Sequence, residues 1–299
     1  MASKDSPVIL VSIAAATAIT ITKFVAAILS GSSGMVSEGL HSLASTVRSV
    51  LLLVGSRMSR RKSDSLHPFG HGKELFFWTL IAVLLVIIVA GAGSIYQGIV
   101  KLVERESIAD VEFNYIVLGI AGALGIAGWI PAIREVRSQR GGRSVWQTLW
   151  NMRDTATLAI YLDGVASVIA LVLATLGIYL SDTHLEPAYD GVAAILIGVM
   201  WFVVLVPLVQ RCRQLLVGEG AEDETLASIT EMVAADPDVR QVVRSRAMSF
   251  GVEDLLVSIG LRFREDLSAS ELGQVIRRIE DRLREHHDGL KHISIEAHP

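Results

Sequence analysis

The chain has 299 residues, of which 51% are hydrophobic and 19% are charged, and its mean hydropathy is +0.49. Ordinary soluble domains carry about 25% charged residues, so the composition argues against a soluble globular protein and predicts a membrane protein. The formal net charge of −4 says little about partners, but we expect no nucleic acid among them. The single cysteine, Cys212, excludes an intramolecular disulfide and any metal site built from several cysteines.

Six segments are long and apolar enough to cross a bilayer, whose hydrocarbon core takes about 20 helical residues. The third, fourth and sixth contain no charged residue, whereas the first carries Lys23, the second a polar motif and the fifth Asp163. In chain order the segments are about 8–29, 35–56, 75–100, 115–133, 155–180 and 191–210. We therefore predict six transmembrane helices within residues 1–211.

The second segment places ionisable side chains inside a predicted span. Glu38, His41, Ser45 and Arg48 are three or four residues apart, so they lie on one face of a helix. Ionisable groups in hydrocarbon are costly, and they usually mark a path for ions or protons. The alternative is that this face packs against a neighbouring helix through buried polar contacts.

Basic residues are unevenly distributed over the connections between these segments. They gather in two of the connections, which hold Arg57, Arg60, Arg61 and Lys62, and Arg134, Arg137, Arg140, Arg143 and Arg153. The connection after the third segment mixes both signs of charge, and residues 181–187 include no lysine or arginine. Because basic loops stay in the cytoplasm, we predict cytoplasmic termini and place the protein in the cell (inner) membrane. The cluster at residues 60–62 suits contact with anionic lipid heads.

Glycines recur inside the spans, most regularly at Gly119, Gly122, Gly125 and Gly128. Small residues allow helices to approach closely in lipid, so we interpret these positions as packing surfaces. A glycine-lined channel is the alternative.

From Arg211 onward the sequence becomes that of a soluble domain. Helical spacing at 222–235 and 268–286 alternates with strand-like spacing at 242–249, 255–263 and 292–296. This order predicts a small open sheet covered by two helices. We expect residues 212–299 to form a cytoplasmic α+β ferredoxin-like (αββαβ) domain, whose task the pattern leaves open between dimerisation, regulation and metal sensing.

Several motifs together resemble those of the cation diffusion facilitator family. They are Ser30-Gly-Ser-Ser-Gly-Met35, Glu38-Gly-Leu-His41-Ser, His67-Pro-Phe-Gly-His71-Gly-Lys73-Glu74-Leu, Tyr189-Asp190-Gly-Val-Ala-Ala-Ile-Leu-Ile-Gly198 and Leu215-Leu-Val-Gly-Glu219-Gly. The likeness is greatest to the branch that has a glutamate three residues before the histidine of the second helix. The resemblance implies an α-helical membrane protein with six transmembrane helices that exports divalent transition metals in exchange for protons. It also implies a homodimer joined through the C-terminal domains, and no enzymatic activity.

The family's transport site takes two ligands from the second helix and two from the fifth, each pair four residues apart. By this resemblance His41 and Asp163 match one position in each pair. Ser45 and Ala159 stand where the other two ligands are expected, and alanine cannot bind a metal. Glu38, one turn from His41, is our candidate for a replacement ligand. Two side chains on each of two facing helices would complete a tetrahedron around zinc.

Arg48 adds a fixed positive charge close to this predicted site. One interpretation is that its long side chain reaches the inner membrane surface. The other is an ion pair with Asp163 or Glu38, in which the guanidinium replaces the charge that a metal would supply.

The resemblance implies a second metal site in the loop between the second and third helices. Asp64, His67 and His71 match its Asp-x-x-His-x-x-x-His pattern, and one carboxylate with two imidazoles suits zinc or a similar ion. The alternative is a solvated loop in which His67 only packs ahead of Pro68.

A third metal site is implied in the C-terminal domain, where Glu296 and His298 fall at the positions of a terminal ligand pair. Val243 and Gly260 stand where some relatives have strand histidines, so this cluster is at best partial. We expect the remaining histidines of the domain, His286, His287 and His292, to be solvated.

Two functions remain open at this stage. The chain is either a metal/proton antiporter, or a transport-impaired relative that acts as a partner subunit or metal-responsive regulator. Zinc is the first choice of metal, with iron and manganese as alternatives, because an atypical ligand set does not define selectivity.

Overall fold

The computed structural model describes residues 6–298 except 106, 107, 109, 143, 222, 253 and 288. These residues divide into two compact units. The first contains the described residues up to Gly55 together with Phe77–Cys212, and the second contains Ser56–Phe76 together with the described residues from Arg213 onward.

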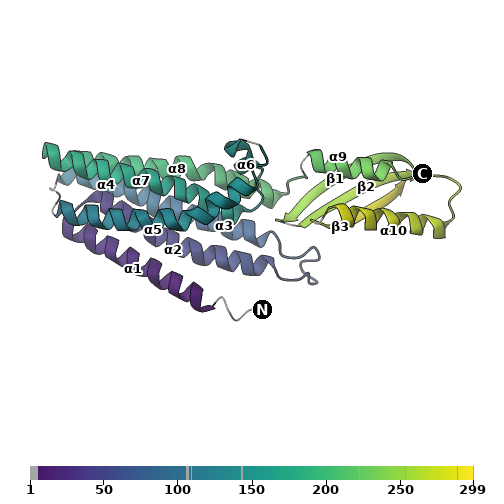
Figure 1. The fold of residues 1–299 in the computed structure, drawn as a ribbon, viewed down its shortest axis with the longest axis horizontal. Coiled ribbons are helices and arrows are strands. Elements are labelled where there is room, and N and C mark those ends of the chain that lie inside the picture. Colours follow the sequence, from purple (N-terminus) through teal and green to yellow (C-terminus); the bar gives the residue numbers. More distant parts are fainter. Residues whose placement is uncertain are drawn as a thin grey trace. The chain divides into compact units, whose positions relative to one another are not determined.

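Long helices that run side by side build the first unit (Figure 1). α5 packs against both α7 and α1. A π-helical segment, η1, joins α3 and α4 into one continuous helix. The elements are α1 (Ser6–Ser30), α2 (Ser33–Ser59), α3 (Glu74–Val86), η1 (Ile87–Ala92), α4 (Gly93–Glu104), α5 (Val111–Ser138), α6 (Val145–Asn151), α7 (Thr155–His184) and α8 (Ala188–Val217).

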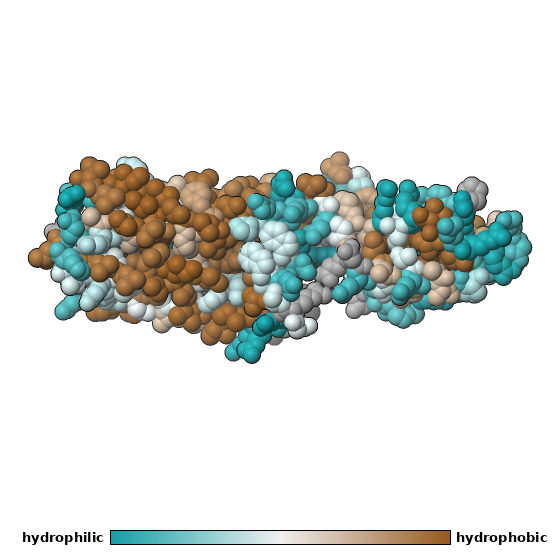
Figure 2. Space-filling model, turned by 90° about the horizontal axis from the view of Figure 1, so that it is seen from above, coloured by the Kyte–Doolittle hydropathy of each residue, from teal (hydrophilic) through white to brown (hydrophobic). Residues whose placement is uncertain are grey.

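Among the described residues, four helices are long and apolar enough to span a membrane. They are Glu74–Glu104, Val111–Ser138, Thr155–His184 and Ala188–Val217, which correspond to the last four predicted spans. Their outer surface is apolar (Figure 2), with Ile88 and Val203 each more than 60% exposed. Water-soluble proteins rarely expose so much apolar surface, so the chain is a multi-pass membrane protein. α1 and α2 have 25 and 27 residues, and their crossing of the membrane stays a prediction.

A buried aspartate fixes the start of α2 to the start of α8. Asp190 accepts hydrogen bonds from the backbone N–H groups of Ser33 (2.6 Å) and Gly34 (3.2 Å) and from the hydroxyls of Ser32 (3.0 Å) and Ser33 (2.8 Å). A carboxylate is stabilised at a helix N-terminus, where backbone N–H groups lack partners within the helix. This contact gives the serines before α2 a structural role, and it fixes the start of the helix that carries Glu38 and His41.

Glycines bring α8 against the helix formed by η1 and α4. A Cβ on Gly98 would lie 2.5 Å from the carbonyl oxygen of Gly191, and one on Gly198 would lie 2.5 Å from that of Gly91. Only glycine permits such an approach of two backbones. The packing interpretation of the α5 glycines holds for Gly122, whose Cβ would meet Leu171 at 2.6 Å. It fails for the other α5 glycines that sequence analysis singled out, because Gly119, Gly125 and Gly128 have nothing within 4 Å of that position.

The second unit contains a three-stranded sheet with strand order β1-β2-β3. β1 is antiparallel to β2, and β2 is parallel to β3. Two helices cover one face of the sheet (Figure 1). The elements are α9 (Asp223–Ala234), β1 (Val239–Gly251), β2 (Asp254–Phe263), α10 (Ala269–His286) and β3 (Leu290–His298). The predicted α-β-β-α-β order is therefore confirmed.

Alternation along β2 decides which face of the sheet is covered. Val257, Ile259 and Leu261 point into a core shared with Ile229 of α9 and Ile279 of α10, and all five are at most 1% exposed. Successive strand residues point to opposite faces, so the residues between them face away from the two helices.

Candidate metal sites

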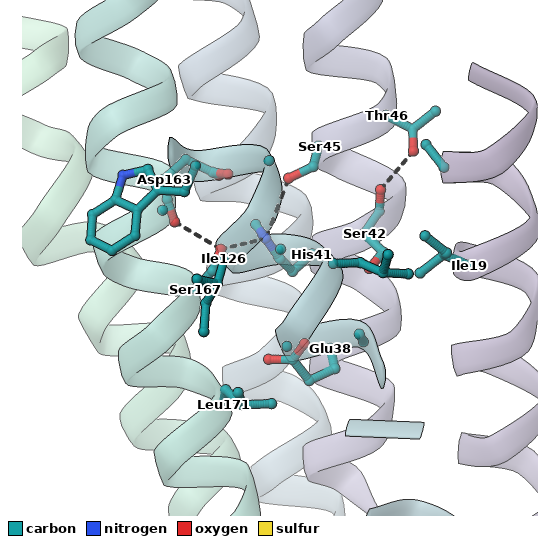
Figure 3. A pocket seen from close by; sticks show the side chains of 18 of the residues that line it. Ile19, Glu38, His41, Ser42, Ser45, Thr46, Ile126, Asp163, Ser167 and Leu171 are labelled. Atoms are coloured by element: carbon teal, nitrogen blue, oxygen red, sulfur yellow. Dashed lines mark hydrogen bonds between the residues drawn. The ribbon is translucent and has the colours of Figure 1, made fainter. Parts of the chain in front are cut away.

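A cavity of about 420 Å³ lies in the helical unit between α1, α2, α5 and α7. Its polar lining is carried mainly by α2 and α7, as the labelled side chains of Figure 3 show. Gly122, Gly125 and Gly128 of α5 form part of the wall. The sequence-predicted residues Glu38, His41, Ser45, Arg48 and Asp163 all line this one cavity.

His41 lies at the centre of the polar lining. Its Nε2 is 3.3 Å from the hydroxyl of Ser45 and 3.0 Å from that of Ser167 (Figure 3). The imidazole ring stacks on Trp201 of α8, with 4.3 Å between centroids and 20° between planes. These contacts orient the ring, and Nδ1 is left without a hydrogen-bond partner among the described residues.

Glu38 forms a buried ion pair with Lys23 of α1. The Nζ atom of Lys23 donates to Oε2 of Glu38 at 2.8 Å, and both side chains are less than 8% exposed. The other carboxylate oxygen, Oε1, is buried and lacks a hydrogen-bond partner in the described part of the chain. Glu38 therefore reaches the cavity as a carboxylate whose charge is already balanced.

Asp163 forms the corresponding ion pair on α7. Its Oδ1 is in contact with Nη1 of Arg48, and both residues are buried. This contact favours the ion-pair hypothesis for Arg48 over the hypothesis of a side chain extended to the membrane surface. Ala159 is 1% exposed and contributes only a methyl group at the place of an expected ligand.

The charges of the cavity therefore balance as two pairs. Removing charges from water is costly unless each one finds a partner, and here each carboxylate has its own cation. Chemically, the cavity offers an imidazole, two carboxylates and hydroxyl groups to an incoming cation. Such a cation must compete with Lys23 and Arg48 for the two acids.

The loop cluster, Asp64, His67 and His71, lies in the second unit. One ligand atom of each residue lies within 4.8 Å of the others, and the two imidazole centroids are 4.2 Å apart. Asp64 and His67 are about half exposed, whereas the side chain of His71 is 8% exposed. The structure thus brings all three predicted residues together in a geometry that suits a metal ion.

Local hydrogen bonds shape the acid of the loop cluster. Oδ1 of Asp64 accepts from the backbone N–H groups of His67 (2.7 Å) and Leu66 (2.9 Å). These hydrogen bonds, chiefly the one from the His67 backbone, lower the pKa of Asp64 below its ordinary value. The carboxylate is therefore ionised at neutral pH. In the described part of the chain, Asp64 has no lysine or arginine partner.

Aromatic contacts hold this loop against the β1–β2 turn within the second unit. Phe69 stacks on Phe250 with 4.9 Å between centroids, and it meets the edge of His292 at 5.4 Å. Gly72 lies so close that a Cβ would be 2.3 Å from the Phe250 carbonyl oxygen. We expected His292 to be solvated, but the structure shows otherwise. Phe69 lies against its ring, and its Nε2 is 3.5 Å from Oδ1 of Asp254.

Glu296 and His298 meet on β3, but a cation already contacts the acid. Nη2 of Arg244 donates to Oε2 of Glu296 at 2.6 Å, while Nε2 of His298 is 3.9 Å from the same oxygen. Gly260 gives the imidazole its room, because a Cβ there would lie 2.7 Å from His298 Nε2. The predicted pair is thus close in space, with an arginine as the partner of its carboxylate.

Sequence reasoning did not single out two residues that line the cavity, or a third that stacks on its histidine. Ser167 lies four residues after Asp163, and that spacing could have revealed it. Lys23 was visible as a charge in the first apolar segment, but its partner was not. Trp201 stands in an apolar run without any signal, since only the packing of α8 brings it to His41.

Comparison with known proteins gives consistent matches. A family model for the cation efflux transmembrane domain matches residues 9–217. The proton-coupled zinc antiporter SLC30A9, mitochondrial, of Xenopus laevis is 30% identical over 234 residues, which are 77% of this chain and 42% of that protein. The metal tolerance protein C4 of Arabidopsis thaliana is 25% identical, over 90% of this chain and 68% of its own length. The manganese efflux system protein MneP of Bacillus subtilis is 22% identical, over 90% of this chain and 87% of its own length. The chain spans about two fifths of the length of its SLC30A9 relatives.

Proposed function

The chain belongs to the cation efflux family, whose members are transporters and not enzymes, and on this premise we propose that it exports divalent transition-metal cations in exchange for protons. The observation that carries the proposal is a single cavity lined by Glu38 and His41 of α2 and by Asp163 of α7, each of which is itself buried. Imidazole nitrogens and carboxylate oxygens bind divalent transition metals, and both groups also bind protons. A metal ion and protons can therefore use the same three side chains in turn.

The two ion pairs give this exchange a specific form. In the proposed cycle, Lys23 and Arg48 balance Glu38 and Asp163 while no metal is bound. An arriving divalent cation binds the two carboxylates and Nδ1 of His41, which has no hydrogen-bond partner among the described residues, and the ammonium and guanidinium groups withdraw. Proton binding to His41 and to the carboxylates then favours release of the metal, because a protonated ligand cannot hold it.

We propose zinc as the transported ion. Nitrogen and oxygen ligands suit it, and the name of the Xenopus laevis relative specifies a proton-coupled zinc antiporter. Manganese enters through the name of the Bacillus subtilis relative, and iron shares the same ligand types.

Further proposals concern the assembly around this cavity. We place residues 1–211 in the membrane as six transmembrane helices, with both termini in the cytoplasm, in the cell (inner) membrane. Residues 212–299 form a cytoplasmic domain that joins two copies into a homodimer. The uneven distribution of basic loop residues supports the orientation, and the sheet face that α9 and α10 leave uncovered offers a surface for the second copy.

We also propose that Asp64, His67 and His71 bind a divalent metal. Three ligand atoms within 4.8 Å of one another support this site, and a fourth ligand comes from water or a partner. Glu296 and His298 are proposed only as a weaker pair, because Arg244 must first release the glutamate.

Uptake into sealed vesicles tests the transport proposal. Purified protein in liposomes is given zinc, iron(II) or manganese(II), with and without a pH gradient, and the accumulated metal is measured. We expect uptake of at least one metal that the gradient accelerates, and its loss in His41→Ala and in Asp163→Asn. His286→Ala, at an exposed position of α10, is the control and should retain the wild-type rate. Wild-type rates in both cavity variants would contradict the assignment of the cavity.

The balanced charges of the cavity favour a second candidate function. If Arg48 and Lys23 never release their acids, the chain keeps the family's architecture and acts as a partner subunit or metal-responsive regulator. The same assay separates the two functions, because the second one requires that no metal of the panel enters the vesicles, with or without the pH gradient. The loop cluster would still bind metal in that case.

A further inference from the structure

The short helix α6 holds two tryptophans on its outer face. Trp146 is 63% exposed and Trp150 is 38% exposed. Their rings stack with 6.1 Å between centroids and 24° between planes. Ser144 and Gln147 form a capping box that stabilises the start of the helix. The ring pair is therefore part of an ordered element of the helical unit.

The opposite face of α6 fastens it to the bundle. Leu149 and the following Met152 are buried in the core of the helical unit. Nε of Arg211, in α8, donates to the carbonyl oxygen of Met152 at 3.2 Å. α6 also packs against α5. Because these contacts fix the inner face, the two tryptophans are held outward and cannot turn into the core.

Arginines lie at the end of α5 that leads into α6. Arg134 and Arg137 are exposed and three residues apart, and exposed Arg140 follows in the next turn. Glu135 is the one acid among residues 134–150, and it accepts a hydrogen bond from Gln139 at 2.7 Å. The segment is therefore strongly basic beside an exposed aromatic surface. Arginine recognises phosphate groups through its planar set of donors.

Tryptophan rings and arginines together match one environment of a membrane protein. Tryptophans gather where hydrocarbon meets the headgroups, and basic residues next to a span attract anionic lipids. α5 itself is long and apolar enough to span the membrane, and Ile130, near its C-terminal end, is 39% exposed.

We propose that α6 and the C-terminal end of α5 bind anionic phospholipid headgroups at the membrane surface. Trp146 and Trp150 lie at the level of the glycerol and upper acyl chains, and Arg134, Arg137 and Arg140 contact the phosphates. The occupant is a lipid of the surrounding bilayer, so binding depends on headgroup charge and on the attached acyl chains.

Native mass spectrometry of the full chain in detergent tests the charge dependence. The protein is titrated with phosphatidylglycerol, with phosphatidylcholine, or with inorganic phosphate. We expect clear preference for phosphatidylglycerol and about 100-fold weaker binding in Arg134→Gln/Arg137→Gln/Arg140→Gln, since each of the three basic residues near an anionic surface adds about fivefold affinity. The control Arg240→Gln/Arg277→Gln/Arg284→Gln removes three arginines of the second unit and should bind like wild type. Equal binding of both lipids, binding of phosphate alone, or an unchanged triple variant would overturn the proposal.

A second measurement, of tryptophan fluorescence, tests the position of the two rings without changing any arginine. Wild-type protein and Trp146→Phe/Trp150→Phe are placed in bilayers that contain phosphatidylglycerol brominated near the headgroup end of its acyl chains. We expect the wild type to show a quenched fluorescence component that the double variant lacks. If bromine leaves the fluorescence of these two tryptophans unquenched, then protein or water, and not lipid, covers the outer face of α6. The proposal would then be wrong.

Discussion

The cavity of the helical unit and the loop cluster of the second unit contain the same donor types in opposite electrostatic settings. In the cavity, Glu38 and Asp163 are each paired with a fixed cation. In the loop, Asp64 faces only His67 and His71 among its described ion-pair partners. Metal affinity therefore cannot be predicted from a set of carboxylates and imidazoles alone, because neighbouring lysines and arginines compete with the metal for the carboxylates.

Burial explains why the two settings differ. The acids of the cavity are buried, where an uncompensated charge costs several kcal/mol. Asp64 is half exposed, so water and two backbone N–H groups stabilise its charge. The cavity therefore contains cations that balance its acids, whereas a metal ion at the proposed loop site would displace no lysine or arginine from Asp64 in the described part of the chain.

We expect the largest effect, a loss of stability, from a substitution that removes one cation from the ion pairs of the cavity. Arg48→Gln leaves Asp163 buried without its cation, and this should cost about 3–5 kcal/mol of stability. Arg48→Gln/Asp163→Asn should recover much of the loss, because neither charge remains. Thermal unfolding in detergent measures both variants. Arg105→Gln is the control, since its ion pair with Glu186 is long and exposed, and such pairs contribute at most about 1 kcal/mol. Equal stability of the single and double variants would contradict the pairing.

The second effect concerns the loop cluster. Asp64→Ala/His67→Ala/His71→Ala removes all three ligands, and we expect zinc affinity at this site to fall at least about 100-fold, which is about 2.7 kcal/mol. Isothermal calorimetry on purified protein measures it, with His286→Ala as the control for a histidine outside the cluster. Retention of the wild-type isotherm would place the bound zinc elsewhere.

A third experiment, with a smaller expected effect, tests whether added carboxylates and the removal of Arg48 give the cavity a higher affinity for zinc. Ser45→Asp/Ala159→Asp adds carboxylates one helical turn from His41 and Asp163, and Arg48→Asn removes the competing cation. In a background without loop ligands, we expect the three changes to tighten zinc binding about tenfold, or about 1.4 kcal/mol. The two aspartates with Arg48 retained are the matched control and should gain less. Unchanged affinity would show that Glu38 and its neighbours already form a complete site.

The smallest effect concerns how the loop is held. Phe69→Ala removes the stacking on Phe250 and should weaken zinc binding by about fivefold, because a loop that must be ordered on binding costs about 1 kcal/mol. Leu66→Ala is the control, since Leu66 belongs to the same loop and is 83% exposed. Calorimetry that finds the two variants alike would rule out a role for the aromatic contact.

Local patterns were enough to predict most of the fold. Four predicted spans and the α-β-β-α-β order follow from runs and periodicities of apolar residues, which act within one helix or strand. The loop cluster was also accessible, because Asp64, His67 and His71 lie within eight consecutive residues and one turn can bring them together. The grouping of residues 56–76 with the second unit was not predicted, since it depends on the packing of Phe69 and Gly72 against the β1–β2 turn.

The sequence by itself determined which ionisable side chains lie within long apolar segments. They include Glu38, His41, Arg48 and Asp163, and because burying such groups is costly, they are candidates for a functional site before any packing is known. Only the tertiary structure decided which charges neutralise each other. Lys23 and Glu38 come from different helices, as do Arg48 and Asp163, and their contacts require the packed bundle. Electrostatic energy depends on distance and burial, and these quantities are defined only when the helices have come together.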